Sequence, residues 1–202
     1  DGINEKGLSF SWLWFASDMK WQSVEKGEED LAIANNMLGT WILGNFSTVD
    51  GAAAGLEKVR VYGYKDPDIL GFVVPAHMII TDAGGGCIVV EYEDGELKVH
   101  QNQLGIMTNA PRFPWMRSYL RYFIGMSNTQ PEVAEFGGDK YKPMGHGFGM
   151  FGLPGDITPP ARFVRLAVMK KFTDTPADAK EALNLARHIV SSLDIAKGMA
   201  VD

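Results

Sequence analysis

The 202-residue sequence contains one cysteine, Cys87, so no disulfide can form within it. A single cysteine does not indicate whether the protein works in an oxidising or a reducing compartment. No apolar run approaches the ~20 residues that a membrane-spanning helix needs. A basic stripe is also missing: 19 Lys and Arg stand against 25 Asp and Glu, and the formal net charge of −6 argues against nucleic acid as a partner.

The sequence also lacks an initiator methionine and a visible signal peptide. Because it opens inside a motif (residues 1–8), we expect it to be an internal part of a longer protein, and the absent leader then leaves cytoplasm and periplasm both open. The composition is that of a soluble globular chain, with 46% hydrophobic and 22% charged residues. The length suits one domain and permits a substantial core.

The spacing of apolar residues predicts one strand and two helices in the first part of the chain. Residues 8–15 alternate and then become fully apolar, which is typical of a strand that is buried first on one face and then on both. Helical spacing predicts a helix over 30–43. A second helix is predicted to follow a capping box formed by Ser47 and Asp50.

A β-rich block follows in the middle of the sequence. Residues 76–81, 87–92 and 96–100 are predicted strands, because each is rich in β-branched or alternating apolar residues. A glycine-rich turn at 82–86 and a hairpin turn at 93–95 connect them. Consecutive strands with such short connections indicate an antiparallel sheet.

The last part of the chain is predicted to be mainly helical. A short strand at 105–108 precedes a helix that begins near Pro114, and a Gly- and Pro-rich loop covers 127–160. Two helices close the chain, and Thr175 is the predicted N-cap of the second. The order of strands and helices indicates a layered α+β domain.

Five short phrases occur along the chain in a fixed order. Together they resemble the choloylglycine hydrolase family, which includes the penicillin V acylases and the bile salt hydrolases. The resemblance covers essentially all of the chain. The phrases are residues 1–8 (DGINEKGL), 75–82 (PAHMIITD), 105–111 (GIMTNAP), 152–156 (GLPGD) and 158–163 (TPPARF).

The resemblance implies the N-terminal-nucleophile fold, an αββα sandwich of two antiparallel sheets between helical layers. It further implies that residues 1–202 are the central part of one such domain, without the N-terminal strand that carries the nucleophile and without the C-terminal strands. The family's nucleophile is a cysteine at the mature N-terminus, whereas this chain begins with Asp1. We therefore expect the segment alone to be inactive.

The activity that the resemblance implies is hydrolysis of an N-acyl amide, as in the penicillin V acylases. The cysteine would attack the carbonyl, form a thioester acyl-enzyme and release an amine, and water would then free the acid. The base in the family is the α-amino group of the cysteine itself, whose ordinary pKa of about 7.7–8.0 suits proton transfer near neutral pH.

Three residues match positions of the family's active site. Asn109 matches the asparagine whose carboxamide donates to the oxyanion. Trp14 matches the second donor, a main-chain N–H, at a position where bile salt hydrolases carry Asn and penicillin acylases an aromatic residue. Arg162 matches an arginine that would favour and orient the thiolate. By residue type alone each has a plainer interpretation: a turn asparagine, a core tryptophan and a helix-start arginine.

Other reactive residue types favour structural roles. Cys87 lies in the middle of a predicted strand among apolar neighbours, where burial makes a thiol inert. The four histidines show no metal-ligand spacing, and His77, inside a family phrase, is expected to be structural. The glycine cluster at 145–149 contains a loose GxG but lacks the GK[ST] of a phosphate loop.

The resemblance implies no metal or organic cofactor, a small-molecule substrate and no nucleic-acid partner. It also implies a homo-oligomer, a tetramer, for the whole protein, and residues 127–160 fall near the family's assembly region. Penicillin V, conjugated bile acids, N-acyl homoserine lactones and other fatty amides all stay open as substrates. Two other functions stay open as well: a ligand-binding relative without catalysis, and an acyltransferase.

Overall fold

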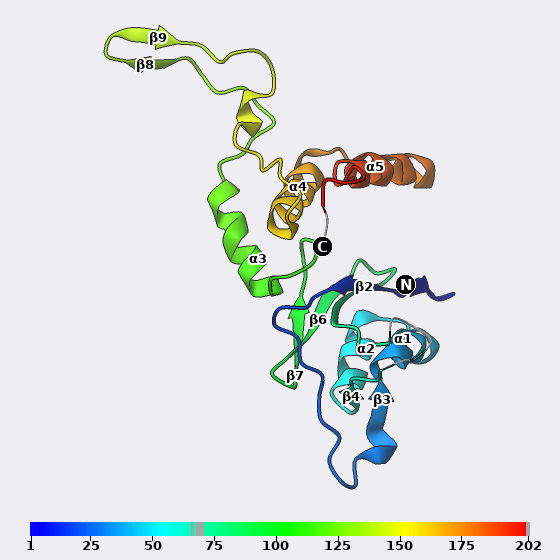
Figure 1. Ribbon diagram of the computed structural model, residues 1–202. Helices are drawn as coiled ribbons and strands as arrows, with labels where there is room; N and C mark the ends of the chain where they lie inside the picture. Colours follow the sequence, from blue (N-terminus) through cyan, green and yellow to red (C-terminus); the bar gives the residue numbers. More distant parts are fainter. Residues whose placement is uncertain (66, 68–70, 201–202) are drawn as a thin grey trace. The chain divides into compact units, whose positions relative to one another are not determined.

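The computed structural model describes residues 1–65, 67 and 71–200. It contains two compact units, Asp1–Trp115 and Met116–Asp202, and each is described by itself (Figure 1).

The first unit is built on a five-stranded antiparallel sheet with the strand order β1-β2-β5-β6-β7. The predicted strands at 76–81, 87–92 and 96–100 are confirmed, as is the strand predicted within 8–15. Isoleucine and valine make up five of the thirteen residues of the neighbouring strands β5 and β6, which are largely buried. The strands are β1 Gly2–Ile3, β2 Ser9–Trp14, β5 Ala76–Thr81, β6 Cys87–Glu93 and β7 Glu96–Gln101.

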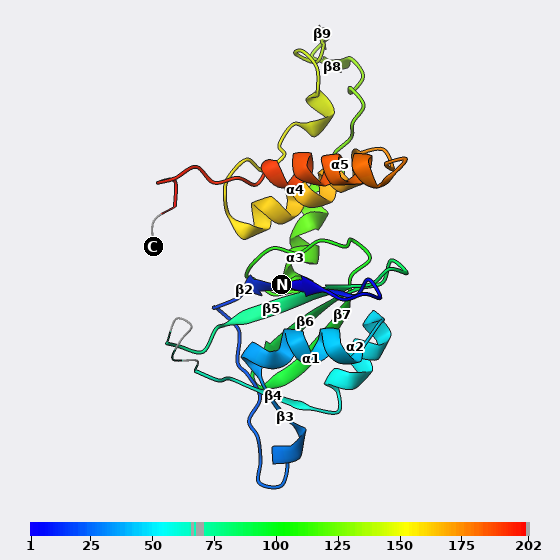
Figure 2. The ribbon, with the colours of Figure 1, turned by 90° about the vertical axis from the view of Figure 1, so that its right-hand side faces the viewer.

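Two helices, α1 (Leu38–Asn45) and α2 (Val49–Leu56), cover one face of this sheet (Figure 2). A Cβ atom on Gly39 would lie 2.8 Å from the ring of Phe10, so glycine is what lets α1 approach β2 this closely. The core lies between the helices and the sheet. Its fully buried members include Leu8, Leu38, Ile42, Met78, Ile80, Ile88, Val90 and Tyr92.

Asp82 links the turn between β5 and β6 to the start of α2. One carboxylate oxygen accepts a hydrogen bond from the N–H of Val49, and the other accepts from the N–H groups of Gly84 and Gly86, each at 2.9 Å. The bond from Val49 is the largest of the effects that lower the pKa of Asp82, followed by that from Gly86. A carboxylate at this place also complements the positive end of the helix dipole.

The helix predicted over 30–43 is wrong in its first half. Glu29–Leu31 (η1) and Asn35–Met37 (η2) are 3-10 turns. Between them, Ala32–Ala34 (β3) pairs in parallel with Arg60–Tyr62 (β4). The pairing with a distant strand outweighs the local helical spacing, which a single sequence cannot reveal.

Both predicted N-cap residues are wrong. The N-cap of α2 is Thr48, not Ser47, and the N-cap of the last helix is Asp178, not Thr175. In each case the true cap is the last residue with extended backbone angles, and its side chain accepts a hydrogen bond from the N–H three residues on. Residue type alone does not select one capping residue from several close neighbours.

The strand predicted at 105–108 is also wrong. The side chain of Asn102 donates to the carbonyl of Ile106 at 2.9 Å and accepts from the N–H of Gly105 at 3.1 Å. Main-chain groups that a ladder would pair are thus satisfied by a side chain, and the segment runs as an irregular loop.

The second unit is mainly helical. The predicted helix after position 114 is confirmed as α3 (Phe113–Leu120), which begins in the first unit, and a 3-10 turn, η3 (Arg121–Phe123), follows it. The predicted loop over 127–160 contains a small hairpin and a 3-10 turn. The remaining elements are β8 Ala134–Phe136, β9 Asp139–Tyr141, η4 Phe148–Met150, α4 Pro159–Phe172 and α5 Ala179–Ser191.

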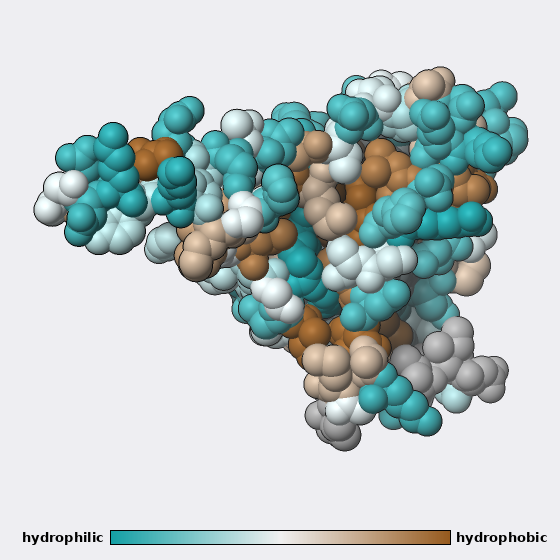
Figure 3. Space-filling view, turned by 90° about the horizontal axis from the view of Figure 1, so that it is seen from above, coloured by the Kyte–Doolittle hydropathy of each residue, from teal (hydrophilic) through white to brown (hydrophobic). Residues whose placement is uncertain are grey.

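Large apolar side chains reach the surface of the second unit. Tyr122, Phe136, Met144 and Phe151 are each at least two-thirds exposed. In the space-filling view, brown apolar residues lie among teal polar ones on the face that is shown (Figure 3). Among the described residues, none of the helices combines the length and the apolar character needed to cross a bilayer.

Candidate active site

Asn109 and Trp14 are in contact, although 95 positions separate them along the chain. The Nδ2 atom of Asn109 donates a hydrogen bond to the main-chain carbonyl of Trp14 at 3.1 Å. Trp14 ends β2, and Asn109 lies on the irregular segment after β7. The structure thus brings together two of the three predicted site residues, and their catalytic role stays a prediction.

The main-chain N–H of Trp14 points to the same edge of β2 as this contact. The N–H of Phe15 donates to the carbonyl of Pro75, just before β5, at 2.9 Å. Successive residues of a strand direct their main-chain groups to opposite edges, so both the N–H and the carbonyl of Trp14 point away from β5. Asn109 bonds that carbonyl, and the two predicted donors therefore share one edge of the strand.

A buried histidine–carboxylate pair lies on the sheet face opposite the helices. Met78 packs in the core on the helix side, so its neighbour His77 points to the other face. His77 Nδ1 lies 3.0 Å from Glu91 Oε1, and both side chains are fully buried. His77 Nε2 lies 2.8 Å from the carbonyl of Thr108, and Glu91 Oε1 accepts from the N–H of Phe113 at 3.0 Å.

Burial by itself would raise the pKa of Glu91, but its partners outweigh burial. Interactions with His100 and His77 and the N–H of Phe113 lower the pKa of Glu91 to about 2. His100 Nε2 is 3.4 Å from Glu91 Oε2, a longer contact than that of His77. Both ring nitrogens of His77 face acceptor oxygens, one from the carboxylate of Glu91 and one from the carbonyl of Thr108.

The depressed pKa of Glu91 predicts a loss of stability in acid. The carboxylate is stabilised only in the folded state, so its contribution is complete above pH ~4.5 and is lost as the pH falls towards 2. The shift corresponds to roughly 3 kcal/mol. We expect the free energy of unfolding, measured with urea at ~25 °C, to decline between pH 5 and pH 2. In the Glu91→Gln variant, the part of the decline that comes from Glu91 should be missing. An equally steep decline in the Gln variant would assign the acid sensitivity to other groups.

One cluster of the described residues has the types that bind metal ions. Potential ligand atoms of Glu91, Glu93 and His100 lie within 4.8 Å of one another. However, the guanidinium of Arg112 contacts Glu93 at 2.9 Å and Asp18 at 3.5 Å, and it supplies positive charge there. Burial, together with the negative charge of Glu91, still raises the pKa of Glu93 against the pull of Arg112. The cluster is therefore explained as an ion-pair network.

Cys87 is buried among apolar neighbours, as predicted, but it opens its strand instead of lying in the middle. It is the first residue of β6, only 8% exposed, and is followed in the strand by fully buried Ile88 and Val89. A buried thiol among apolar side chains is a poor nucleophile. This burial argues against a catalytic role for Cys87.

Arg162, the third predicted site residue, lies in the first turn of α4 in the second unit. Its Nε atom donates to the carbonyl of Ile157 at 3.1 Å, and partial burial together with the charge of Arg165 lowers the pKa of Arg162. Arg165 donates to the carbonyls of Pro154 and Asp156 at 2.9 and 2.7 Å. These bonds give Arg165 a role in holding the loop before α4.

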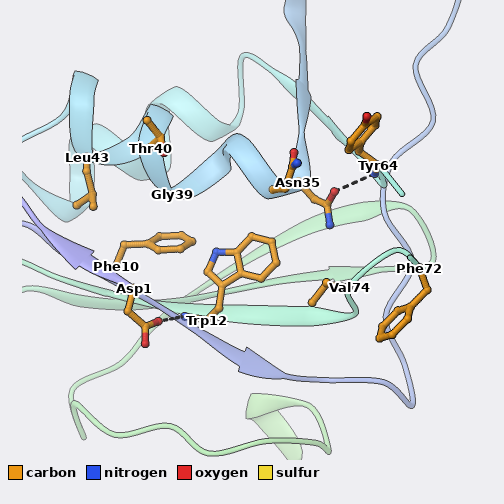
Figure 4. Close-up of a pocket in the computed structure, with 11 residues that line it drawn as sticks. Asp1, Phe10, Trp12, Asn35, Gly39, Thr40, Leu43, Tyr64, Phe72 and Val74 are labelled. Carbon is orange, nitrogen blue, oxygen red and sulfur yellow. Dashed lines mark hydrogen bonds between the residues drawn. The ribbon is translucent and has the colours of Figure 1, made fainter. Parts of the chain in front are cut away.

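A cavity of about 340 Å³ lies between β2 and α1 (Figure 4). Four of its eleven lining residues are aromatic, namely Phe10, Trp12, Tyr64 and Phe72, and the others include the polar residues Asp1, Asn35, Asn36 and Thr40. The ring of Phe72 also meets the edge of Trp14, with ring centres 6.0 Å apart. The side chain of Phe72 thus links the cavity to Trp14, at the end of β2.

Comparison with known families gives one match that spans the chain. The family described as linear amide C-N hydrolases, choloylglycine hydrolase family, matches residues 1–202. The chain belongs to the choloylglycine hydrolase family. The α+β fold agrees with this assignment, because a crystal structure of a mutant conjugated bile acid hydrolase from Clostridium perfringens superposes with a TM-score of 0.87 at 29% identity, covering 100% of this chain and 61% of that one.

Curated relatives from two branches of the choloylglycine hydrolase family match the sequence. A bile salt hydrolase/transferase from Clostridium perfringens is 29% identical over 201 residues, which are 98% of this chain and 60% of that protein. A penicillin V acylase from Pectobacterium atrosepticum is 28% identical over 115 residues, 56% of this chain and 30% of that protein. The chain therefore spans about three-fifths of the first relative. The longer match is thus to the bile salt hydrolase/transferase, whereas the aromatic residue at Trp14 is the feature that resembles the penicillin acylases.

Sequence reasoning in terms of this family missed Glu91. A signal was available, because Glu91 interrupts the apolar run of residues 87–92, and the structure buries every residue of β6. A carboxylate in such a strand requires partners, which a sequence alone does not identify. His77 was expected to be structural, and the structure adds that it contacts the residue immediately before Asn109.

Proposed function

We propose that these residues form the central part of an amide hydrolase domain that cleaves an N-acyl amide through a cysteine thioester. The observation that carries the proposal is the contact between the Asn109 carboxamide and the main chain of Trp14, at the edge to which the Trp14 N–H also points. Two neutral donors on one edge suit the oxyanion of a tetrahedral intermediate, because they stabilise negative charge without adding a charge of their own.

In the proposed mechanism, a cysteine outside these residues attacks the carbonyl of the substrate. Its sulfur bonds to the carbonyl carbon while Asn109 and the Trp14 N–H hold the oxyanion. The C–N bond then breaks, the amine leaves with a proton from the α-amino group of the cysteine, and water hydrolyses the thioester to the acid. Arg162 would favour the thiolate form of the nucleophile.

The aromatic cavity supports an apolar acyl group on the substrate. A cavity of about 340 Å³ with four aromatic lining residues is suited to a hydrocarbon chain or a planar ring. Phe72 lines the cavity and also meets the ring of Trp14. Penicillin V, conjugated bile acids, N-acyl homoserine lactones and fatty amides all fit this description.

The proposal is tested by a substrate panel on the whole protein. We expect equal amounts of amine and acid to be released from at least one of penicillin V, a glycine-conjugated bile acid and an N-acyl homoserine lactone. The 202-residue segment alone should release none, because its single cysteine is buried in β6. Hydrolysis by the segment alone, or ligand binding without turnover by the whole protein, would contradict the proposal, and the second result would indicate a binding protein.

Acyl transfer is a second candidate, favoured by one observation. The Clostridium perfringens relative carries the name bile salt hydrolase/transferase. A thioester intermediate can be attacked by an amine instead of water, with formation of a new amide. Product analysis with an added amine distinguishes the two outcomes, because transfer yields the new amide in place of the free acid.

We also propose that the whole protein is a homo-oligomer, and a tetramer as the family resemblance implies. The support from this chain is the apolar surface of the hairpin formed by β8 and β9, where Phe136 is 68% and Tyr141 55% exposed. Exposed aromatic residues on one hairpin are typical of a surface that is covered in an assembly.

A further inference from the structure

The segment that carries Asn109 is an irregular loop. It is neither helix nor strand from position 103 to position 112. Side chains hold it instead: Asn102 bonds it near its start, and His77 and Glu91 bond it on either side of Asn109. The position of the Asn109 carboxamide therefore depends on these side chains rather than on a regular element.

His77 and Glu91 hold the segment from the two central strands of the sheet. His77 Nε2 donates to the carbonyl of Thr108, the residue before Asn109, and Glu91 accepts from the N–H of Phe113, four residues after it. The 3.0 Å contact between His77 and Glu91 joins the two attachments into one buried unit. A loop held on both sides by a rigid unit has little freedom to move the residues between.

His77 also contacts the strand that carries the second predicted donor. The ring of Phe15 stacks on the ring of His77, with centres 4.5 Å apart and planes only 6° from parallel. Phe15 directly follows Trp14 in the chain. One imidazole ring thus lies against the neighbours of both predicted donors, Thr108 before Asn109 and Phe15 after Trp14.

We propose that His77 and Glu91 are positioning residues that set the Asn109 carboxamide at the geometry required for the oxyanion. This inference rests on the proposed function. The pair touches no reacting atom and acts through Asn109. A merely structural pair would affect folding, whereas a positioning pair affects turnover through Asn109, and the two roles can be separated by experiment.

The test uses the whole protein and compares His77→Phe with His77→Gln. Phenylalanine retains a ring that can stack on Phe15 but cannot donate to Thr108, whereas glutamine places an amide nitrogen close to the position of His77 Nε2. We expect His77→Phe to lower kcat by about 10- to 100-fold with KM within about threefold, because small displacements of catalytic groups have such effects. His77→Gln should recover most of the loss.

A double-mutant cycle with Asn109→Ala shows whether His77 acts through Asn109. We expect His77→Phe to have almost no further effect on kcat when Asn109 is already alanine, because its target is gone. The proposal would be overturned if kcat of the double variant fell by the product of the two single-variant factors. An unchanged kcat in His77→Phe would overturn it as well. If His77→Phe does not fold, Glu91→Gln takes its place in the same cycle under the same criteria.

Met78→Ala is the matched control for lost stability. Met78 is the next residue of β5, is fully buried and packs on the opposite face, away from Asn109. The Met78→Ala variant should have a lower unfolding temperature and an unchanged kcat. A loss of kcat in Met78→Ala as large as that in His77→Phe would overturn the proposal. Failure of the proposed function is distinguishable, because then Asn109→Ala itself leaves turnover unchanged or the unmodified protein cleaves no amide.

Discussion

Asn109→Ala is expected to lower kcat of the whole protein by about 10²–10³-fold, which corresponds to ~3–4 kcal/mol of transition-state stabilisation. The reason is that the carboxamide would donate to an oxygen that becomes negative only in the transition state. Its effect should therefore fall on kcat, and substrate binding should change little. The measurement is steady-state kinetics on whichever amide the panel identifies.

Two further variants make this expectation specific. Asn109→Asp keeps the shape of the side chain but removes its N–H donors, so its activity should fall at least as far as that of the alanine variant. Asn45→Ala is the matched control, because Asn45 likewise donates from its carboxamide to a main-chain carbonyl, that of Trp41. Asn45→Ala should retain full turnover. A rate unchanged in both Asn109 variants would remove Asn109 from the mechanism.

The second large effect is expected on stability, from Glu91→Ala. The substitution removes the buried carboxylate that lies against His77 Nδ1 and that accepts from the N–H of Phe113. Removal of one partner from a buried ion pair costs about 3–5 kcal/mol. The free energy of unfolding, measured by urea denaturation at neutral pH, should fall by that amount.

Replacement of both partners distinguishes an ion-pair effect from a cavity effect. The double variant His77→Phe with Glu91→Leu leaves no buried charge at this position and fills much of the same volume. It should be more stable than Glu91→Ala, because paired apolar replacements of buried ion pairs are often near neutral. If the free energy of unfolding of Glu91→Ala lay within about 1 kcal/mol of that of the unmodified protein, the pair would not be held as the structure indicates.

The sheet could be predicted from the sequence because its signals are local. Strands β5, β6 and β7 are short apolar or alternating segments joined by glycine-containing turns, and Asp94 and Gly95 both adopt positive φ in the last of these turns. The first half of the helix predicted over 30–43 failed for the opposite reason. Ala32–Ala34 pairs with Arg60–Tyr62, and no local pattern reports such a partner.

The site was predictable only through the family phrases. Asparagine before Ala110 and Pro111 suggests a turn, and tryptophan at the end of an apolar strand suggests core. The structure adds the contact between Asn109 and Trp14, which depends on the path of the chain between β7 and α3. Glu91 and His77 lay beyond prediction as a pair, because their contact depends on the register of β5 against β6.

The carboxylate of Asp82 ties three backbone amides from two elements to one side chain. The tip of the β5–β6 hairpin and the first turn of α2 therefore cannot open independently, since release of either disturbs the same acceptor. Helical layer and sheet behave as one cooperative unit at this corner, and a fluctuation there would expose both together.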